Sequence, residues 1–316
     1  MRRINRISDL LKGTVRSLNY HARMFFFEDY RRIQYIPQHL DIINLGSNPA
    51  KFDIDYSDSG YNGFSLAVGP QTLEYDFRIL KNFHSFLDCK GPRICLLVLC
   101  PLSLCKYRYK QEDGEVHRDL RYYPILHHSQ INNYSEAEYI KWVKRPLWQI
   151  LKHPGLGRPF INFLRHRRVQ NISVGASADC LRSSAEAMLN SWKREFGLTD
   201  FSGSNLPGEI KLNLSKNEAI LNDIKQFCEE RDIRPIVVLP PVSRHLTSHI
   251  SDNFLEECLY SRISDKGIQT IDFMKHPEWS RDENFAKALY LHTRASKEFT
   301  KVLIERLKLN SQYVLA

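Results

Sequence analysis

The chain has 316 residues, a mass of 37.1 kDa and a formal net charge of +9. Its 42% hydrophobic and 26% charged residues are typical of a folded protein and exclude wholesale disorder, and 14 Gly and 14 Pro exclude a collagen-like repeat. No run approaches the ~20 apolar residues that a membrane-spanning helix needs.

Two segments carry the excess positive charge. Residues 1–34 hold eight basic and three acidic side chains, and residues 106–168 hold thirteen basic and six acidic ones. Such patches attract anionic partners. We expect residues 1–38 to form a basic N-terminal segment. Charged residues interrupt any secretory apolar region there, so a cytoplasmic location is expected. The apolar cluster Met24–Phe27 predicts either peripheral contact of residues 1–34 with the inner membrane or packing on the core.

Short apolar runs rich in Ile, Val and Leu predict five buried parallel strands. In chain order they are 40–45, 64–68, 93–99, 234–239 and 269–273. Apolar residues at helical spacing predict helices at 72–87, 254–263 and 294–307, and Ser215 with Glu218 forms a predicted capping box that opens another helix. This alternation predicts an α/β fold of three layers (α/β/α) with a five-stranded parallel, flavodoxin-like sheet in the order 2-1-3-4-5.

The third strand is followed by a long basic insertion, residues 106–213, which is predicted to be mostly helical and has a helical pattern near 178–196. Because it leaves the end of a strand, we expect it to cap the carboxyl edge of the sheet, where such folds bind ligands. The α/β core would then comprise residues 39–105 and 214–310.

Several site classes are not indicated by the sequence. The seven cysteines show no zinc-ligand spacing, so we expect buried free thiols in a reducing compartment, and no metal or cofactor. No GxGxxG motif follows the first strand and no P-loop is present. Nucleic-acid binding is not expected, because the basic segments match no known recognition fold.

Small and polar residues follow each predicted strand and so should meet at the carboxyl edge. The candidates for the site are Ser47, Asn48, Gly69, Gln71, Ser103, His245 and His292. Hydroxyls, an amide, backbone N–H groups and a histidine that converge on one crevice are what a preorganised functional site needs.

The blocks Ile43–Asn48, Gly69–Asp76 and Ile236–Pro241, with the terminal His292, resemble the SGNH (GDSL-like) hydrolase superfamily, in particular a branch found beside bacterial surface-polysaccharide genes. In that superfamily the nucleophile is a serine two residues after the first-block glycine. A histidine at the start of the final helix is the base, and an aspartate three residues before it orients the ring. A glycine after the second strand and a polar residue after the third supply the oxyanion hole.

Two positions depart from this pattern. Asn48 stands where the nucleophile is expected, with Ser47 one residue earlier, and Leu289 stands where the aspartate would precede His292. Ser47 could still be the nucleophile and His292 its base, with Asp272, Asp282 or Glu283 orienting the ring. Asn48 would otherwise be a ligand contact in a site that has lost its chemistry. Gly69, Gln71, Ser103 and His245 are expected to provide oxyanion or ligand contacts.

The resemblance therefore implies one of two functions. The first is a carbohydrate esterase or O-acyltransferase that acts on a bacterial surface polysaccharide through a Ser47–His292 acyl-enzyme mechanism. The alternative is a catalytically degenerate protein that binds a glycan or acyl donor, or scaffolds polysaccharide assembly. In both, the expected partner is a carbohydrate or acylated glycan, and the basic insertion favours an anionic one.

Overall fold

The computed structural model describes residues 32–33, 35–89, 91, 93–109, 115–123, 125–139 and 175–312. The predicted membrane contact of residues 1–34 lies almost entirely outside them, as does the middle of the predicted insertion. Contacts along the chain divide it into two compact units. One comprises Pro37–Tyr107 with Ile172–Ala316, and the other comprises Met1–Ile36 with Arg108–Asn171. The second half of the predicted insertion thus groups with the α/β core, and the domain boundaries stay a prediction.

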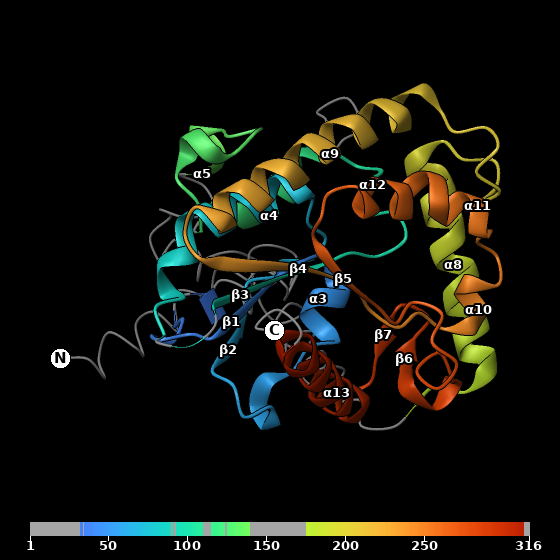
Figure 1. The fold of residues 1–316 in the computed structure, drawn as a ribbon. Helices are drawn as coiled ribbons and strands as arrows, with labels where there is room; N and C mark the ends of the chain where they lie inside the picture. The colour runs from blue at the N-terminus through green and yellow to red at the C-terminus, as the bar shows by residue number, and fades with distance from the viewer. Residues whose placement is uncertain are drawn as a thin grey trace, which may run out of the picture. The chain divides into compact units, whose positions relative to one another are not determined.

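The larger unit is built on a five-stranded parallel sheet in the order β2-β1-β3-β4-β5, as predicted (Figure 1). The strands are β1 Ile42–Gly46, β2 Gly63–Ser65, β3 Arg93–Val98, β4 Ile233–Leu239 and β5 Gln269–Asp272. The strands β1, β3 and β4 are nearly continuous runs of apolar residues because both of their faces are covered.

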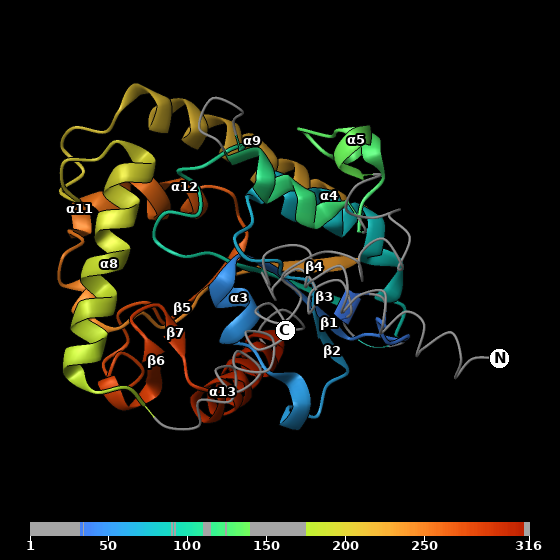
Figure 2. The same ribbon diagram turned by 180° about the vertical axis from the view of Figure 1, so that it is seen from behind.

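Helices cover both faces of the sheet, which confirms the three-layer α/β/α fold. On one side lie α4 Leu73–Phe83 and α9 Gly208–Glu229, and on the other lie α3 Asn48–Phe52 and α13 Thr293–Gln312 (Figures 1 and 2). Phe299 and Leu303 of α13 pack with Ile42, Leu96 and Val238 of the sheet in one buried cluster.

Several further elements of this unit follow β3, β4 and β5. They are α8 Ala178–Phe196, α10 Arg244–Thr247, a continuous helical stretch made of α11 Asp252–Leu255, a π-helical turn Glu256–Tyr260 and α12 Ser261–Ser264, and the hairpin of β6 Phe285–Lys287 with β7 Tyr290–Leu291. Helix α8 lies against α10 and β6, so this part of the predicted insertion covers loops at the carboxyl edge. In the other unit, α5 spans Glu136–Tyr139.

One predicted helix boundary is wrong. The capping box of Ser215 and Glu218 does not open a helix, because α9 already begins at Gly208 and Ser215 lies inside it. There the Ser215 hydroxyl donates to the Lys211 carbonyl, 3.4 Å away, one helical turn earlier.

All seven cysteines are free thiols, but only four are buried as predicted; Cys180 is exposed, and Cys89 and Cys100 are partly exposed. The Cys95 and Cys105 thiols are buried and each contacts a second thiol, on Cys228 and Cys258; these contacts and burial raise the pKa of both Cys95 and Cys105. Among the residues that the structure describes, no helix is both long and apolar enough to cross a membrane.

Candidate functional site at the carboxyl edge of the sheet

The turn between β1 and α3 brings Ser47 to the loop that follows β2. Ser47 is the N-cap residue of α3, but its hydroxyl does not cap the helix. Its Oγ instead accepts a hydrogen bond from the Gln71 N–H, with 3.3 Å between the heavy atoms. The structure therefore brings together the predicted residues Ser47 and Gln71, both partly exposed.

A buried carboxylate fixes the loop that carries Gln71. Asp76 Oδ1 accepts the Gly46 N–H at 2.7 Å and also accepts the side-chain amide of Gln71, whose Oε1 accepts the Val68 N–H at 3.1 Å. Burial raises the pKa of the Asp76 carboxyl to about 7, although the hydrogen bonds from Gln71 and Gly46 act to lower it. Sequence reasoning missed this role. The available signal was an acidic residue in the first turn of a helix that directly follows a strand.

Asn48 contacts a residue that was not among the predicted ones. Its Nδ2 donates to the Tyr290 hydroxyl at 3.2 Å, across 242 positions of the sequence. Its Oδ1 is buried and has no hydrogen-bond partner among the described residues. That atom lies 1.6 Å from the position that a Cβ on Gly69 would occupy, so any larger residue at position 69 would force the Asn48 side chain to move. Asn48, Gly69 and Tyr290 therefore form one group.

The Tyr290 side chain is held in a largely apolar setting. Its ring centroid lies 5.2 Å from that of Phe52, and burial raises the pKa of its hydroxyl to about 12, against a lowering effect of the Asn48 hydrogen bond. The next residue, Leu291, donates its N–H to Asp53 Oδ1 at 2.8 Å, which ties β7 to the end of α3. Burial raises the pKa of Asp53 well above its usual value.

His292 uses both of its ring nitrogens in other contacts. Its Nδ1 accepts the Ala295 N–H at 3.2 Å, in the first turn of α13, so Nε2 carries the ring hydrogen and donates it to the Glu283 carbonyl at 2.8 Å. Its backbone N–H donates to the Asn284 carbonyl at 3.0 Å. The hydrogen bonds of His292 and Ser47 in the described chain thus do not join the two residues, and the proposed catalytic pair stays a prediction.

None of the three acids offered as an orienter places its carboxylate on His292. Asp282 contacts His245 Nε2 at 3.1 Å and pairs with Arg244 through two contacts of 3.0 Å. Burial acts to raise the pKa of Asp282, but the hydrogen bonds from Arg244 and His245 outweigh it and lower the value. Asp272 accepts from the Tyr260 hydroxyl and the Met274 N–H, and Glu283 meets His292 only through its main chain.

Ser103 is occupied within its own turn. Its hydroxyl accepts the Cys100 N–H at 2.8 Å and contacts Cys100 Sγ at 3.2 Å, closing the turn that follows β3. The roles predicted for Ser103 and His245 in ligand binding stay predictions.

Five residues meet where the sequence predicts a crevice, and this group is hereafter called the Asn48 crevice after that prediction: Ser47, Asn48, Gly69, Gln71 and Tyr290. The group offers hydrogen-bonding groups without a nucleophile–base pair. The Ser47 and Tyr290 hydroxyls each accept one hydrogen bond and retain a hydrogen to donate. Among the described residues, no group of three or more His, Cys, Asp and Glu side chains could hold a metal ion. No protein-family model matches the chain, and a search of curated proteins finds no match.

Proposed function

We propose that this chain is a catalytically degenerate protein of SGNH type that binds a carbohydrate or acylated glycan in the Asn48 crevice. The observation that carries the proposal is the hydrogen bond between Asn48 and Tyr290. Asn48 stands two residues after Gly46, where the resemblance expects the serine nucleophile. Tyr290 is the side chain that meets it, whereas His292, at the position that the resemblance gives to the base, hydrogen-bonds to Glu283 and Ala295.

This pair cannot perform acyl transfer. A nucleophile must give up a proton to a nearby base as it attacks a carbonyl carbon. An amide nitrogen has its lone pair delocalised, and a phenol with a pKa of about 12 keeps its proton at neutral pH and accepts no second one. Both partners thus lack the necessary chemistry, while the Ser47 and Tyr290 hydroxyls keep hydrogens that can be donated to a hydroxyl-rich ligand.

The competing hypothesis is an esterase or O-acyltransferase that uses Ser47 and His292. It requires His292 to release the Ala295 N–H or the Glu283 carbonyl before it can accept a proton from Ser47. It also requires Ser47 to turn away from Gln71. The hydrogen bonds of both residues therefore favour the non-catalytic function.

The first test is for chemical activity. The full chain is incubated with p-nitrophenyl acetate, with acetylated oligosaccharides and with a fluorophosphonate probe that labels activated serines. We expect no turnover above buffer and no label. Turnover that Ser47→Ala and His292→Ala abolish equally, with the exposed Ser183→Ala as an unaffected control, would establish the enzyme instead.

The second test is for binding. Acidic and neutral oligosaccharides are titrated into the wild type and into Asn48→Ala, Tyr290→Phe and Ser47→Ala. We expect Asn48→Ala to weaken binding most, because it removes the amide that holds the Tyr290 hydroxyl in place. Equal affinity in all four proteins would contradict binding in this crevice.

A further inference from the structure

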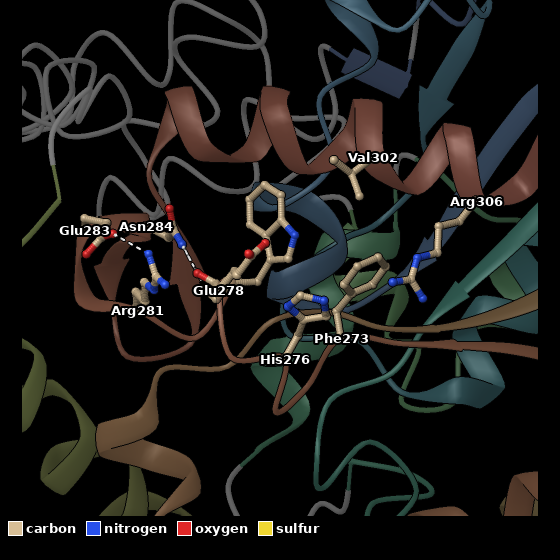
Figure 3. A pocket seen from close by; sticks show the side chains of 9 residues that line it. Phe273, His276, Glu278, Arg281, Glu283, Asn284, Val302 and Arg306 are labelled. Atoms are coloured by element: carbon tan, nitrogen blue, oxygen red, sulfur yellow. Dashed lines mark hydrogen bonds and ion pairs between the residues drawn. The ribbon is translucent and has the colours of Figure 1, made fainter.

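A cavity lies between α13 and the chain that follows β5. Its volume is about 420 Å³, in the range of small-molecule sites. Figure 3 shows its lining, with Arg306 on one side and Arg281, Glu283 and Asn284 on the other. We call it the Trp279 pocket, after the largest side chain in its wall.

Aromatic rings form a rigid wall of the pocket. Phe299 of α13 is fully buried and holds two of them in edge-to-face contact, with centroid distances of 5.1 Å to Phe273 and 5.4 Å to Trp279. The His276 ring lies 5.6 Å from that of Phe273, and its buried Nδ1 has no hydrogen-bond partner in the described part of the chain. A partly exposed Trp ring held this firmly loses little freedom when a flat apolar face stacks on it.

Two charged residues beside this wall, Arg306 and Glu278, form no ion pair with any described residue. The Arg306 guanidinium lies 4.9 Å from the Phe273 ring centroid, and no carboxylate of a described residue pairs with it. On the opposite side Arg281 is 3.9 Å from Glu283, while the exposed Glu278 carboxylate has no ion pair with any described residue. The Arg306 side is therefore positive, and the Glu278 side can accept hydrogen bonds.

His292 supports this wall. Its Nε2–H and backbone N–H hold the carbonyls of Glu283 and Asn284, and the Asn284 side-chain amide donates to the carbonyls of Glu278 and Trp279 at 2.9 and 3.3 Å. The residue that the sequence offers as a base thus links α13 to the Trp279 pocket.

We propose that the Trp279 pocket binds one sugar unit that carries a carboxylate, as part of an acidic oligosaccharide. Trp279 stacks on the apolar face of the sugar ring, Arg306 pairs with the carboxylate, and Glu278 accepts hydrogen bonds from ring hydroxyls. The assignment rests on the proposed function, because it takes the ligand to be a glycan, and it adds both the class of sugar and a second point of attachment.

The test measures binding of the full-length protein to oligogalacturonate, hyaluronan oligosaccharides and oligosialic acid, each beside its carboxyl-reduced, neutral form. We expect at least one acidic oligosaccharide to bind and its reduced form to bind on the order of tenfold more weakly. Trp279→Ala and Arg306→Gln should each weaken acidic binding by a similar factor. Arg306→Gln should also bring the acidic and reduced forms close to equal affinity.

The matched control is Arg294→Gln, an exposed arginine on the same helix that pairs with Glu298. It should leave binding unchanged. Because Trp279 also packs on Phe299, Trp279→Phe and the surface variant Arg306→Gln keep the test independent of folding. Wild-type affinity in both of those variants, or no binding of any acidic oligosaccharide, would overturn the assignment.

Variants of the Asn48 crevice in the same titrations separate the two proposals. If Asn48→Ala weakens binding while Arg306→Gln and Trp279→Phe do not, the result contradicts binding in the Trp279 pocket and supports binding in the Asn48 crevice. If only the variants of the Trp279 pocket weaken binding, the result supports binding in that pocket and contradicts binding in the Asn48 crevice.

Discussion

Gly46 is the residue on which the geometry of the Asn48 crevice depends. Its φ is +129°, a conformation that side chains rarely adopt, and an added Cβ would lie 2.4 Å from the Val98 carbonyl oxygen of the neighbouring strand. Neither the strain nor the overlap with main chain can be relieved by a side-chain rotation. Glycine is thus required here for the turn that places Ser47 and Asn48.

Gly46→Ala should lower the free energy of unfolding by about 2–4 kcal/mol, from the strained φ together with the overlap. Urea denaturation followed by circular dichroism measures it. Gly91→Ala is the control, because its added methyl meets no atom within 4 Å. Equal midpoints for the two variants would show that the turn relaxes freely.

Asp76 makes the stability of the same loops depend on pH. In the unfolded chain its carboxyl titrates near 3.8, and in the folded protein near 7, chiefly because burial disfavours the charged form. Between these values the unfolded state binds fewer protons than the folded state. This group therefore makes stability fall as pH rises from about 4 to about 7, with no further change above.

Asp76→Asn removes the titrating carboxyl, so the variant should lose this fall of stability with pH. The difference in unfolding free energy between wild type and variant should therefore change steadily from pH 4 to 7. Urea denaturation at half-unit intervals of pH measures this difference. The exposed Asp223→Asn on α9 should give a difference that varies much less with pH. A constant difference for Asp76→Asn across this range would contradict a raised pKa.

At the scale of elements, the strands could be predicted because continuous apolar runs have few alternatives in a sheet covered on both faces. The start of α9 could not. Ser215 and Glu218 have the spacing of a capping box, but Asn213 and Asn217 on the same helix face inward. Their amides donate to carbonyls of the segment that follows β3, at 3.0 Å to Cys105 and 2.7 Å to Leu104. These tertiary contacts stabilise α9 on the N-terminal side of Ser215, although the local sequence there has the pattern of a helix N-terminus.

Asn217→Ala should destabilise the protein by about 1–3 kcal/mol, because it leaves the Leu104 and Lys106 carbonyls without their side-chain donor. Thermal and urea unfolding measure the loss. Asn222→Ala, an exposed position on the same helix, should be close to neutral. A neutral result at Asn217 would mean that water replaces the amide at no cost.

At the scale of the whole molecule, the strand order indicated which residues follow the carboxyl ends of the strands but not how each side chain points. Tyr290 and His292 are two residues apart, on either side of the point where β7 ends and α13 begins. His292 is drawn into the first turn of α13 by the Ala295 N–H, and Tyr290 remains to meet Asn48. A histidine at the start of a helix looks the same in sequence whether it serves catalysis or caps the helix.

The fold therefore allows a direct test of whether the Asn48 crevice has the geometry of a catalytic site. Asn48→Ser supplies the hydroxyl two residues after Gly46, and Tyr290→His supplies a base at the side chain that now contacts Asn48. Lys287 lies three residues before Tyr290, so Lys287→Asp completes the spacing of the SGNH pattern.

We expect the triple variant to hydrolyse p-nitrophenyl acetate at least about tenfold faster than the wild type and to react with a fluorophosphonate at position 48, because a serine activated by a neighbouring histidine gains nucleophilicity. Initial rates and mass spectrometry of the labelled peptide measure both effects. The double variant Asn48→Ser, Lys287→Asp is the matched control and should stay inactive, since it keeps Tyr290 and therefore has no base. The contrary outcome is a folded triple variant that neither hydrolyses p-nitrophenyl acetate nor reacts with the fluorophosphonate. That result would show that Tyr290 does not occupy the position of the base. It would remove the main support for the proposal that the Asn48 crevice is a degenerate catalytic site.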